Sequence, residues 1–382
     1  MSALDLPPLT YLSFDSVVNG VGASQVVPYV SRLARRGLAV ELHSFEPSVD
    51  ASMAAALADA GVQWKPHAFG AGGAVAGLGR VVRGARAVRG AALVHARSHP
   101  AGFAAVLARC PRWVWDVRSI WSEQRIDQGM LRRGSPAERT VRRLEKSAAC
   151  RSTGVVTLSQ TAIPALEART GCAVAAKARV ISTCVDLDVF GVGPLLSVSP
   201  VRVLASGTLN KLYDVPAMLA FVDRLRLRRP AVLERVGAGG SPWEAEFAAA
   251  GVSRSECSFS EMPARLLESH AGVCLLRGDA ASATAATPTK VAEFLACGRP
   301  VVVSPGLGDL PALLESGRCG VVLAGTDVDA LDRAAAQLEE LLDDAETPAR
   351  CRAVADRHFN IETAVDTLLD LYRTVTDTFG GD

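Results

Sequence analysis

The chain has 382 residues, of which 49% are hydrophobic and 21% are charged, so it carries enough apolar surface for two domains of ordinary size. Its net charge of +1 argues against a dedicated nucleic-acid-binding protein, because such proteins need a basic excess to displace the counterions of phosphate groups. No apolar run approaches the roughly 18 residues of a membrane span, and the first residues do not resemble a signal peptide. The nine cysteines form no CxxC pair, so we expect reduced thiols and a cytoplasmic protein.

A short strand, a turn and a helix alternate along the first half of the chain. The first helix is expected over residues 24–36, with Val26, Val30 and Leu33 on one face and Gly37 at its end. Such alternation predicts a parallel sheet covered by helices on both faces. The strands of this half are expected at residues 9–14, 39–44, 93–96, 113–117 and 155–158.

The second half repeats the pattern after a segment rich in Gly, Pro and Ser, residues 190–200, which we interpret as the interdomain linker. A closing helix is expected over residues 361–379. Doubly wound sheets bind ligands at the carboxyl ends of their strands, so the loops at 15–22, 97–100, 118–129, 207–214 and 277–289 are the candidate site loops. The second series of strands is expected at residues 201–205, 231–236, 272–276, 300–304 and 320–323.

The most informative stretch is residues 287–304, TPTKVAEFLACGRPVVVS. Thr287 is expected to cap a helix and Pro288 to occupy its first position. Lys290 and Glu293 then share one face near the helix N-terminus, where the partial positive charge suits a diphosphate. A carboxylate one turn further along can accept two hydrogen bonds from a ribose diol. The alternative is an ordinary amphipathic helix with an exposed Lys–Glu pair.

The pattern PTKxxEFLAxGxPVV resembles the nucleotide-sugar motif of the retaining GT-B glycosyltransferases of family 4. Other segments are similar to a subgroup of that family in the same order: YLSFDSVVNGVGASQVVPYVSRLARRG, VHARSHPAG, VWDVRSIWSEQRIDQG, VISTCVDLDVF and VLASGTLNKLYD. The resemblance implies an α/β protein with two Rossmann-like, doubly wound parallel-sheet domains that face a central cleft. Residues 1–190 would form the acceptor domain, residues 191–358 the nucleotide-sugar domain and residues 359–382 a closing helix.

The resemblance also implies the residues that bind the donor. Glu293 would bind the ribose hydroxyls, and Lys211 would neutralise the diphosphate, with Thr208 at the position of the usual Arg. The first Glu of the family's E-x7-E pair is replaced by Ala285. The other expected donor-binding residues are Gly20 and Gly22 in a loop beneath the phosphates, Gly207, and Thr287, Thr289 and Lys290, with hydroxyls such as that of Thr284 standing in for the missing Glu.

For catalysis, Arg118 stands near the position of a His that contacts the donor sugar in many relatives. We expect Arg118, Lys211 and Glu123 to be the catalytic residues. A surface network of ion pairs among Asp116, Arg118, Glu123, Arg125 and Asp127 is the alternative.

Two histidines and two Arg-rich stretches fall outside this assignment. His95 and His99 lack a third metal ligand, so we expect packed or acceptor-facing side chains and no metal site. The stretches at residues 79–90 and 131–146 are interpreted as solvated helix faces, in preference to a surface that docks on anionic lipid.

The function expected from the sequence is retaining transfer of a sugar from a UDP- or GDP-sugar to an acceptor. A small soluble acceptor is favoured, for example in specialised-metabolite biosynthesis, and an unusual nucleophile such as a thiol stays open, as does a lipid or polysaccharide. No cofactor besides the donor and no nucleic acid is expected. Membrane association stays open but is not favoured, and no oligomeric state is assigned. The alternatives are a nucleotide-sugar epimerase of the same fold and a binding or regulatory subunit without catalysis, since the first Glu and the His are absent.

Overall fold

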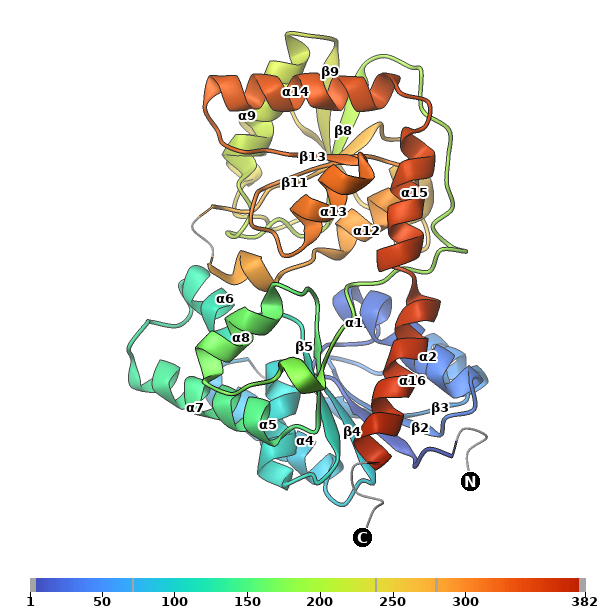
Figure 1. Ribbon diagram of the computed structural model, residues 1–382, viewed down its shortest axis with the longest axis vertical. Coiled ribbons are helices and arrows are strands. Elements are labelled where there is room, and N and C mark those ends of the chain that lie inside the picture. Colours follow the sequence, from blue (N-terminus) through green and yellow to red (C-terminus); the bar gives the residue numbers. More distant parts are fainter. Residues whose placement is uncertain (1–4, 71, 238, 279–280, 378–382) are drawn as a thin grey trace. The chain divides into compact units, whose positions relative to one another are not determined.

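The computed structural model describes residues 5–70, 72–237, 239–278 and 281–377, and the contacts within it divide the chain into two compact units. Unit 1 contains residues 1–182 and 361–382, and unit 2 contains residues 183–360. Each unit has a parallel β-sheet flanked by helices (Figure 1). The expectation of two Rossmann-like parallel-sheet domains is therefore confirmed.

The sheet of unit 1 has seven parallel strands in the order β3-β2-β1-β4-β5-β6-β7. The direction of winding reverses between β1 and β4, and crevices for ligands form at such switch points. Every residue of β4 and β5 is buried, as expected for strands covered on both faces. The strands are β1 (Leu9–Leu12), β2 (Val40–Glu46), β3 (Val62–Ala68), β4 (Leu93–Arg97), β5 (Trp113–Val117), β6 (Gly154–Thr157) and β7 (Ala178–Val180).

Helices connect these strands, and one helix from the end of the chain joins them. α16 (Ile361–Asp377) packs on β5, β6 and α2, where Arg32 and Arg36 form ion pairs with Glu362. The Tyr372 hydroxyl of α16 lies 2.8 Å from Nδ1 of His95 in β4. The remaining helices are α1 (Gly20–Gln25), α2 (Val27–Arg35), α3 (Ala51–Asp59), α4 (Ala74–Ala87), α5 (Ser98–Ala108), α6 (Trp121–Asp127), α7 (Pro136–Arg151), α8 (Ala162–Thr170) and the short 3-10 helix η1 (Ala175–Lys177).

The sheet of unit 2 has six parallel strands in the order β10-β9-β8-β11-β12-β13, with its switch point between β8 and β11. Val301 and Val303 of β12 belong to one buried cluster and Val302 to a second, so the sheet is buried on both faces. The strands are β8 (Val201–Ser206), β9 (Ala231–Val236), β10 (Ser253–Ser255), β11 (Ala271–Cys274), β12 (Val301–Val303) and β13 (Gly320–Val322).

The helices of unit 2 start at side-chain caps in two places. Asp214 accepts a hydrogen bond from Ala217 N, and Asp327 accepts one from Ala330 N, which satisfies backbone groups that a helix leaves free. The helices are α9 (Val215–Arg226), α10 (Glu244–Ala249), α11 (Met262–Leu267), the 3-10 helix η2 (Ala281–Ala285), α12 (Thr289–Ala296), α13 (Leu310–Gly317), α14 (Val328–Asp343) and α15 (Thr347–His358).

Each of the ten predicted strands corresponds to an observed strand, but β3, β7 and β10 were not predicted. β3 is only partly buried and contains Pro66, and the other two are three-residue strands at sheet edges, so none shows a regular apolar pattern. The predicted linker at residues 190–200 falls inside unit 2, where Gly193 N donates to Cys297 O. The predicted helix at 361–379 is observed up to Asp377, and residues 378 and 379 lie outside the described part.

Two further expectations were wrong. The helix predicted over residues 24–36 is two helices, α1 and α2, because Pro28 has no N–H and α2 starts anew at Val27. Cys150 and Cys172 form a disulfide between the end of α7 and the segment after α8, whereas reduced thiols were expected throughout. The two cysteines lie 22 positions apart, so no short motif in the sequence marks the pair.

Candidate functional site

The carboxyl edge of the unit 2 sheet is built around two glycines. Gly207 follows β8 with φ +82°, and Gly237 follows β9 with φ +147°, conformations that favour glycine. A Cβ atom at Gly237 would lie 2.7 Å from the carbonyl oxygen of Gly207, so the two loops pack backbone against backbone. Because the direction of winding reverses between β8 and β11, the loop after β8 lies at the switch point of this sheet.

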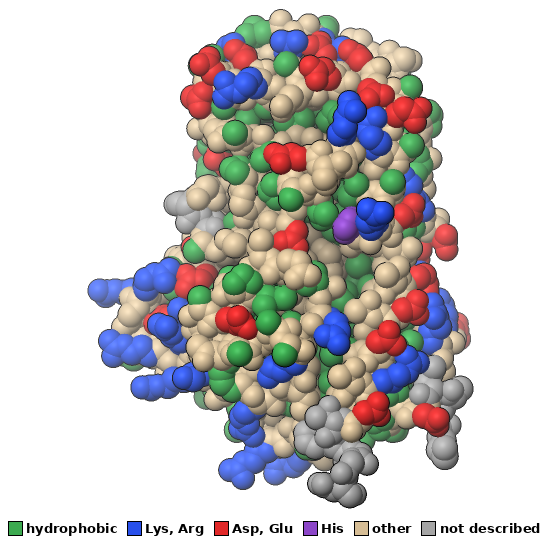
Figure 2. All heavy atoms as spheres, viewed as in Figure 1, with side chains coloured by type: hydrophobic (Ala, Val, Ile, Leu, Met, Phe, Trp, Pro, Cys, Tyr) green, Lys and Arg blue, Asp and Glu red, His purple; other side chains and the backbone are tan. Residues whose placement is uncertain are grey.

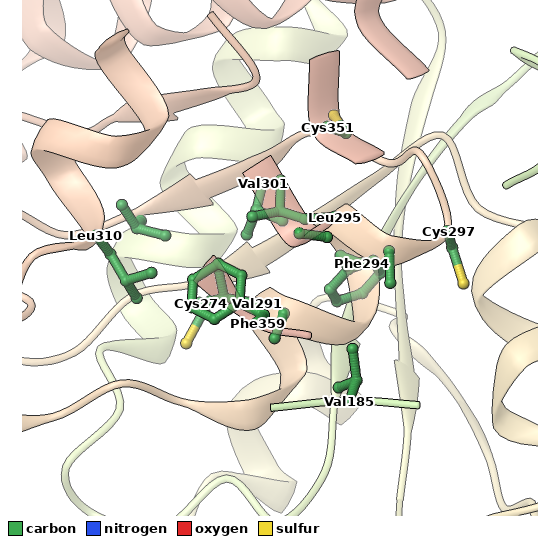
Figure 3. Close-up of a cluster of buried hydrophobic side chains, with 14 of the residues drawn as sticks. Val185, Cys274, Val291, Phe294, Leu295, Cys297, Val301, Leu310, Cys351 and Phe359 are labelled. Atoms are coloured by element: carbon green, nitrogen blue, oxygen red, sulfur yellow. The ribbon is translucent and has the colours of Figure 1, made fainter. Parts of the chain in front are cut away.

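Helix α12 presents Lys290 and Glu293 at this edge. Its Val291, Phe294 and Leu295 are fully buried in a cluster that also contains Val185 and Phe359 (Figure 3). Lys290 and Glu293 are each only 9% exposed, which is unusual for charged side chains. The exposed Lys–Glu pair considered as the alternative is therefore wrong.

The surroundings of these two side chains set their charge. Burial raises the pKa of Glu293 to about 7, although the Lys290 ammonium opposes this shift. Burial would lower the pKa of Lys290, but Tyr213 and Cys274 outweigh it and the pKa is raised. Lys290 is thus an ammonium at neutral pH, and its Nζ lies 4.3 Å from the centroid of the Tyr213 ring.

The start of α12 differs by one residue from the expectation. Pro288 is the N-cap residue, in extended conformation, and Thr289 begins the helix, so Thr287 does not cap it. The carbonyl of Thr287 instead accepts a hydrogen bond from the Thr183 hydroxyl at 2.9 Å. No side chain among the described residues caps this helix, which leaves the amides of Thr289 and Lys290 available to a ligand, whereas Val291 N donates to Pro288 O at 3.0 Å.

The other expected donor residues of unit 2 occupy different environments. Lys211 and Thr208 are exposed in the loop after β8. Ala285, where the family has a Glu, is buried at the end of η2, and Thr284 beside it is exposed. Gly207 lies next to Lys290, since a Cβ there would lie 3.5 Å from Nζ.

At the carboxyl edge of the unit 1 sheet, Asp116 is the centre of a buried polar network. The Arg118 Nε donates to Asp116 at 2.8 Å, and His95 Nε2 lies 3.2 Å from the same carboxylate. Burial would raise the pKa of Asp116, but Arg118 and His95 lower it, so the group is a carboxylate. Burial lowers the pKa of His95, so its Nε2–H donates to Asp116 while Nδ1 accepts from Tyr372.

Glu123 belongs to a second network, centred on Arg169. The Arg169 guanidinium contacts Glu123 at 3.1 Å, Glu138 at 2.6 Å and Glu145 at 3.2 Å. Glu123 also binds Arg133 at 2.6 Å. No ion pair or hydrogen bond within the described residues joins Glu123 to Arg118, so these two expected catalytic residues are not brought together.

Around this second network lie the other residues that the sequence singled out. His99 packs between Trp115 and Trp121, and burial lowers its pKa to about 3. Arg125 lies over the ring of Trp121, with 5.1 Å between its guanidinium carbon and the ring centroid. Both His99 and Arg125 therefore pack against the aromatic side chains of the unit.

Gly20 and Gly22 lie in helix α1, not in a loop. Gly22 packs so tightly on the backbone of Ser16 and Val17 that a Cβ atom would overlap the Ser16 carbonyl. The backbone of Ser16 and Val17 fills the space beside Gly22. Gly20, with φ +58°, has no atom within 4 Å of the position that a Cβ atom would take.

Two residues of these edges were missed by the sequence reasoning. Arg97 ends the buried strand β4, lies 3.4 Å from Asp116 and contacts Asp15 at 3.6 Å. A charged residue at the end of a buried strand was the signal that could have found it. The ring of Tyr213 lies against Lys290. Nothing in the sequence marked Tyr213 as a site residue, because an aromatic residue in a loop usually serves only to pack against its neighbours.

The two Arg-rich stretches are not alike. In α4, Arg80 donates a hydrogen bond to the carbonyl of Phe69 and Arg83 donates one to the carbonyl of Ala68. The face that carries these two residues is therefore only partly solvated. In α7, the exposed cations form no ion pair with the described residues, and Figure 2 shows Lys and Arg side chains gathering over α6 and α7. The exposed cations of α7 are Arg139, Arg142, Arg143, Lys146 and Arg151. No helix in the described part combines the length and apolar composition that crossing a bilayer requires.

Comparison with known families matches both halves of the chain. A model described as Glycosyltransferase Family 4 matches residues 22–189, and one described as Glycosyl transferases group 1 matches residues 201–344. No curated protein sequence matches the chain.

Solved structures share the fold of the whole chain. A sucrose-phosphate synthase from Thermosynechococcus elongatus has a TM-score of 0.73 at 16% identity and covers 97% of this chain and 100% of its own. Anabaena Alr3699/HepE, in complex with UDP and glucose, has a TM-score of 0.68 at 15% identity, covering 95% and 98%. AviGT4, a glycosyltransferase involved in avilamycin A biosynthesis, has a TM-score of 0.63 at 17% identity, covering 97% and 98%.

Proposed function

The chain belongs to the GT-B glycosyltransferases of family 4, group 1, and from this we propose that it transfers a sugar from a nucleotide diphosphate to an acceptor with retention of anomeric configuration. The donor would be a UDP- or GDP-sugar, with UDP favoured because similar structures were crystallised with UDP or UDP-glucose. The enzyme would need no cofactor of its own besides this donor.

The observation that carries the proposal is the buried carboxylate of Glu293 on α12. Its pKa near 7 leaves it able to ionise at neutral pH, and it makes no hydrogen bond with the described residues. A ribose diol would supply two donors to that carboxylate, and the uncapped amides of α12 would receive the diphosphate. Stabilising the departing diphosphate in this way is electrostatic catalysis, which needs no covalent intermediate.

For unit 1, we propose that Arg118 serves the acceptor side. The ion pair between Arg118 Nε and Asp116 fixes the orientation of the guanidinium before a substrate binds. Glu123 is bound by two Arg side chains and fits a role in positioning α6 better than a role as a base. We propose a small soluble acceptor. An assay with different acceptors would show whether a thiol, a lipid or a polysaccharide is used instead.

Glu293→Ala tests the placement of the donor. Losing a charged hydrogen-bond acceptor should weaken UDP or GDP binding by more than about tenfold, as a loss of about 1.5–3 kcal/mol requires. Titration calorimetry on the full chain measures this. The matched control is Glu261→Ala in the same unit, because the Glu261 carboxylate accepts hydrogen bonds from nearby Ser258 and from no other described residue. Equal affinity of wild type and Glu293→Ala would refute the ribose assignment.

Turnover distinguishes the proposed reaction from its alternatives. The full chain is incubated with UDP- and GDP-sugars and a panel of alcohol and thiol acceptors, and products are read by mass spectrometry and by the anomeric proton coupling in NMR. A glycoside with the donor's anomeric configuration supports the proposal, and an inverted product refutes retention. An epimerised donor would indicate an epimerase. Binding without turnover across the panel would favour a regulatory subunit, which the Ala285 replacement also suggests.

A further inference from the structure

Lys290 is a buried cation on α12. The residue is only 9% exposed, and its Nζ has no hydrogen-bond acceptor among the residues that the structure describes. The face of the Tyr213 ring lies against it, with 4.3 Å between Nζ and the ring centroid. Glu293 acts on this ammonium electrostatically but makes no hydrogen bond to it. Burying an ammonium without a hydrogen-bonded counter-charge is unfavourable, so a site of this kind favours an anion bound from outside the chain.

The position of Nζ indicates where that anion would lie. A Cβ atom at Gly207 would lie 3.5 Å from Nζ, so the amine faces the glycine turn after β8. This turn lies at the switch point between β8 and β11. Lys290 is the second residue of α12, an eight-residue helix that no described side chain caps. The ammonium, the amides of Thr289 and Lys290, for which the described residues supply no acceptor, and the small glycine together form a binding site for an oxyanion.

The other cation proposed from the sequence has a different environment. Lys211 is exposed in the loop between β8 and α9, and nothing in the described part of the chain holds its amine. An exposed, unrestrained Lys is a weak phosphate ligand, because solvent screens its charge and binding must order a flexible chain. Lys290 is already ordered, desolvated and adjacent to the amides.

On this geometry we propose that Lys290, and not Lys211, is the main cation that binds the donor diphosphate, which deepens and rests on the function proposed above. Glu293 lies one turn further along α12, about 4.5 Å along the axis for three residues. The spacing suits a nucleoside diphosphate whose phosphates contact Lys290 and whose ribose contacts Glu293. The usual Arg is absent at Thr208, and Lys290 supplies the charge from another element.

The test separates the phosphates from the nucleoside. Wild type, Lys290→Met and Lys211→Met are titrated calorimetrically with UDP, with uridine, and with inorganic pyrophosphate, and GDP and guanosine replace the uracil compounds if the wild type prefers them. We expect Lys290→Met to weaken UDP and pyrophosphate binding at least tenfold and to change uridine binding less than twofold. Lys211→Met tests the competing assignment and should weaken UDP binding by a smaller factor than Lys290→Met does.

Three results would overturn the proposal. One is unchanged UDP affinity in Lys290→Met; another is an equal loss for UDP and uridine, which would mean a structural role for Lys290. The third is a larger loss in Lys211→Met. Thermal unfolding of the ligand-free variants checks folding, and Lys290→Met should not lower the midpoint, because it removes an unpaired buried charge; if it does, Lys290→Gln is titrated instead. A wild type that binds neither UDP nor GDP would refute the proposed function itself, which is a different outcome.

Discussion

At the scale of single residues, the burial of the Glu293 carboxyl destabilises the folded chain at neutral pH. Its pKa is about 7 in the folded chain against an ordinary value of 4.5, because burial disfavours the charged form. The folded state therefore holds the proton more tightly than the unfolded chain does. The resulting penalty on folding is absent below pH 4.5, grows between pH 4.5 and 7, and is complete above pH 7.

Glu293→Gln should therefore stabilise the ligand-free protein in a pH-dependent way. At pH 8 we expect the free energy of unfolding to rise by about 2–3 kcal/mol, and at pH 5 by less than about 1 kcal/mol. Urea unfolding at the two pH values measures the difference. An equal gain at both pH values would show that packing, and not the charge of the carboxyl, limits stability at this position.

At the scale of secondary-structure elements, α1 shows how a short helix depends on one close contact. Gly22 is buried against the backbone of Ser16 and Val17, and the carboxylate of Glu46 in β2 accepts hydrogen bonds from both residues. The backbone before α1 is thus anchored to the sheet and cannot move away to admit a side chain. The helix keeps its place because its third residue has no Cβ atom.

Gly22→Ala should destabilise the protein by about 1–3 kcal/mol, the usual effect of overpacking against a fixed backbone. Gly79→Ala in α4 is the control, since that position is helical and has open space around it, and alanine there should be neutral or slightly stabilising. Thermal unfolding of both variants checks the pair. A destabilisation of similar size in both would mean that the contact with Ser16 is not the cause.

At the scale of the whole molecule, the sequence predicted the two sheets better than it predicted the sites. An apolar run such as that of β12 marks a buried strand directly, because it can be recognised without knowing which strands lie beside it in the sheet. The environment of Lys290 depends on Tyr213 and Gly207, which come from a loop far away in the sequence, so spacing along α12 showed a Lys–Glu pair but not its burial. Glu123 was expected to lie with Arg118, but it forms an ion pair with Arg169, which is distant in the sequence and could not be identified from spacing.

The division of the chain also has a consequence for folding. Unit 2 is continuous in sequence, and its two ends meet where Val185 N donates to Phe359 O at 2.8 Å. Each of its sheet faces has its own buried cluster. A fragment of residues 183–360 should therefore fold alone and unfold cooperatively in urea, as followed by circular dichroism, whereas residues 1–182 alone should lack the near-ultraviolet signal of packed aromatics. A fragment 1–182 with that signal would show that α16 is dispensable.

The position of α16 sets an order of events during synthesis. Strands β5 and β6 emerge early from the ribosome, but the helix that covers them, with Leu371 and Val375 against Gly154, follows unit 2 in the chain. At ordinary rates of translation, on the order of ten seconds passes before this helix appears. During that interval unit 1 presents an uncovered apolar sheet face, while unit 2 has everything it needs to fold. The unit that begins first is thus completed last, and the nascent chain must be protected over this face until its final helix arrives.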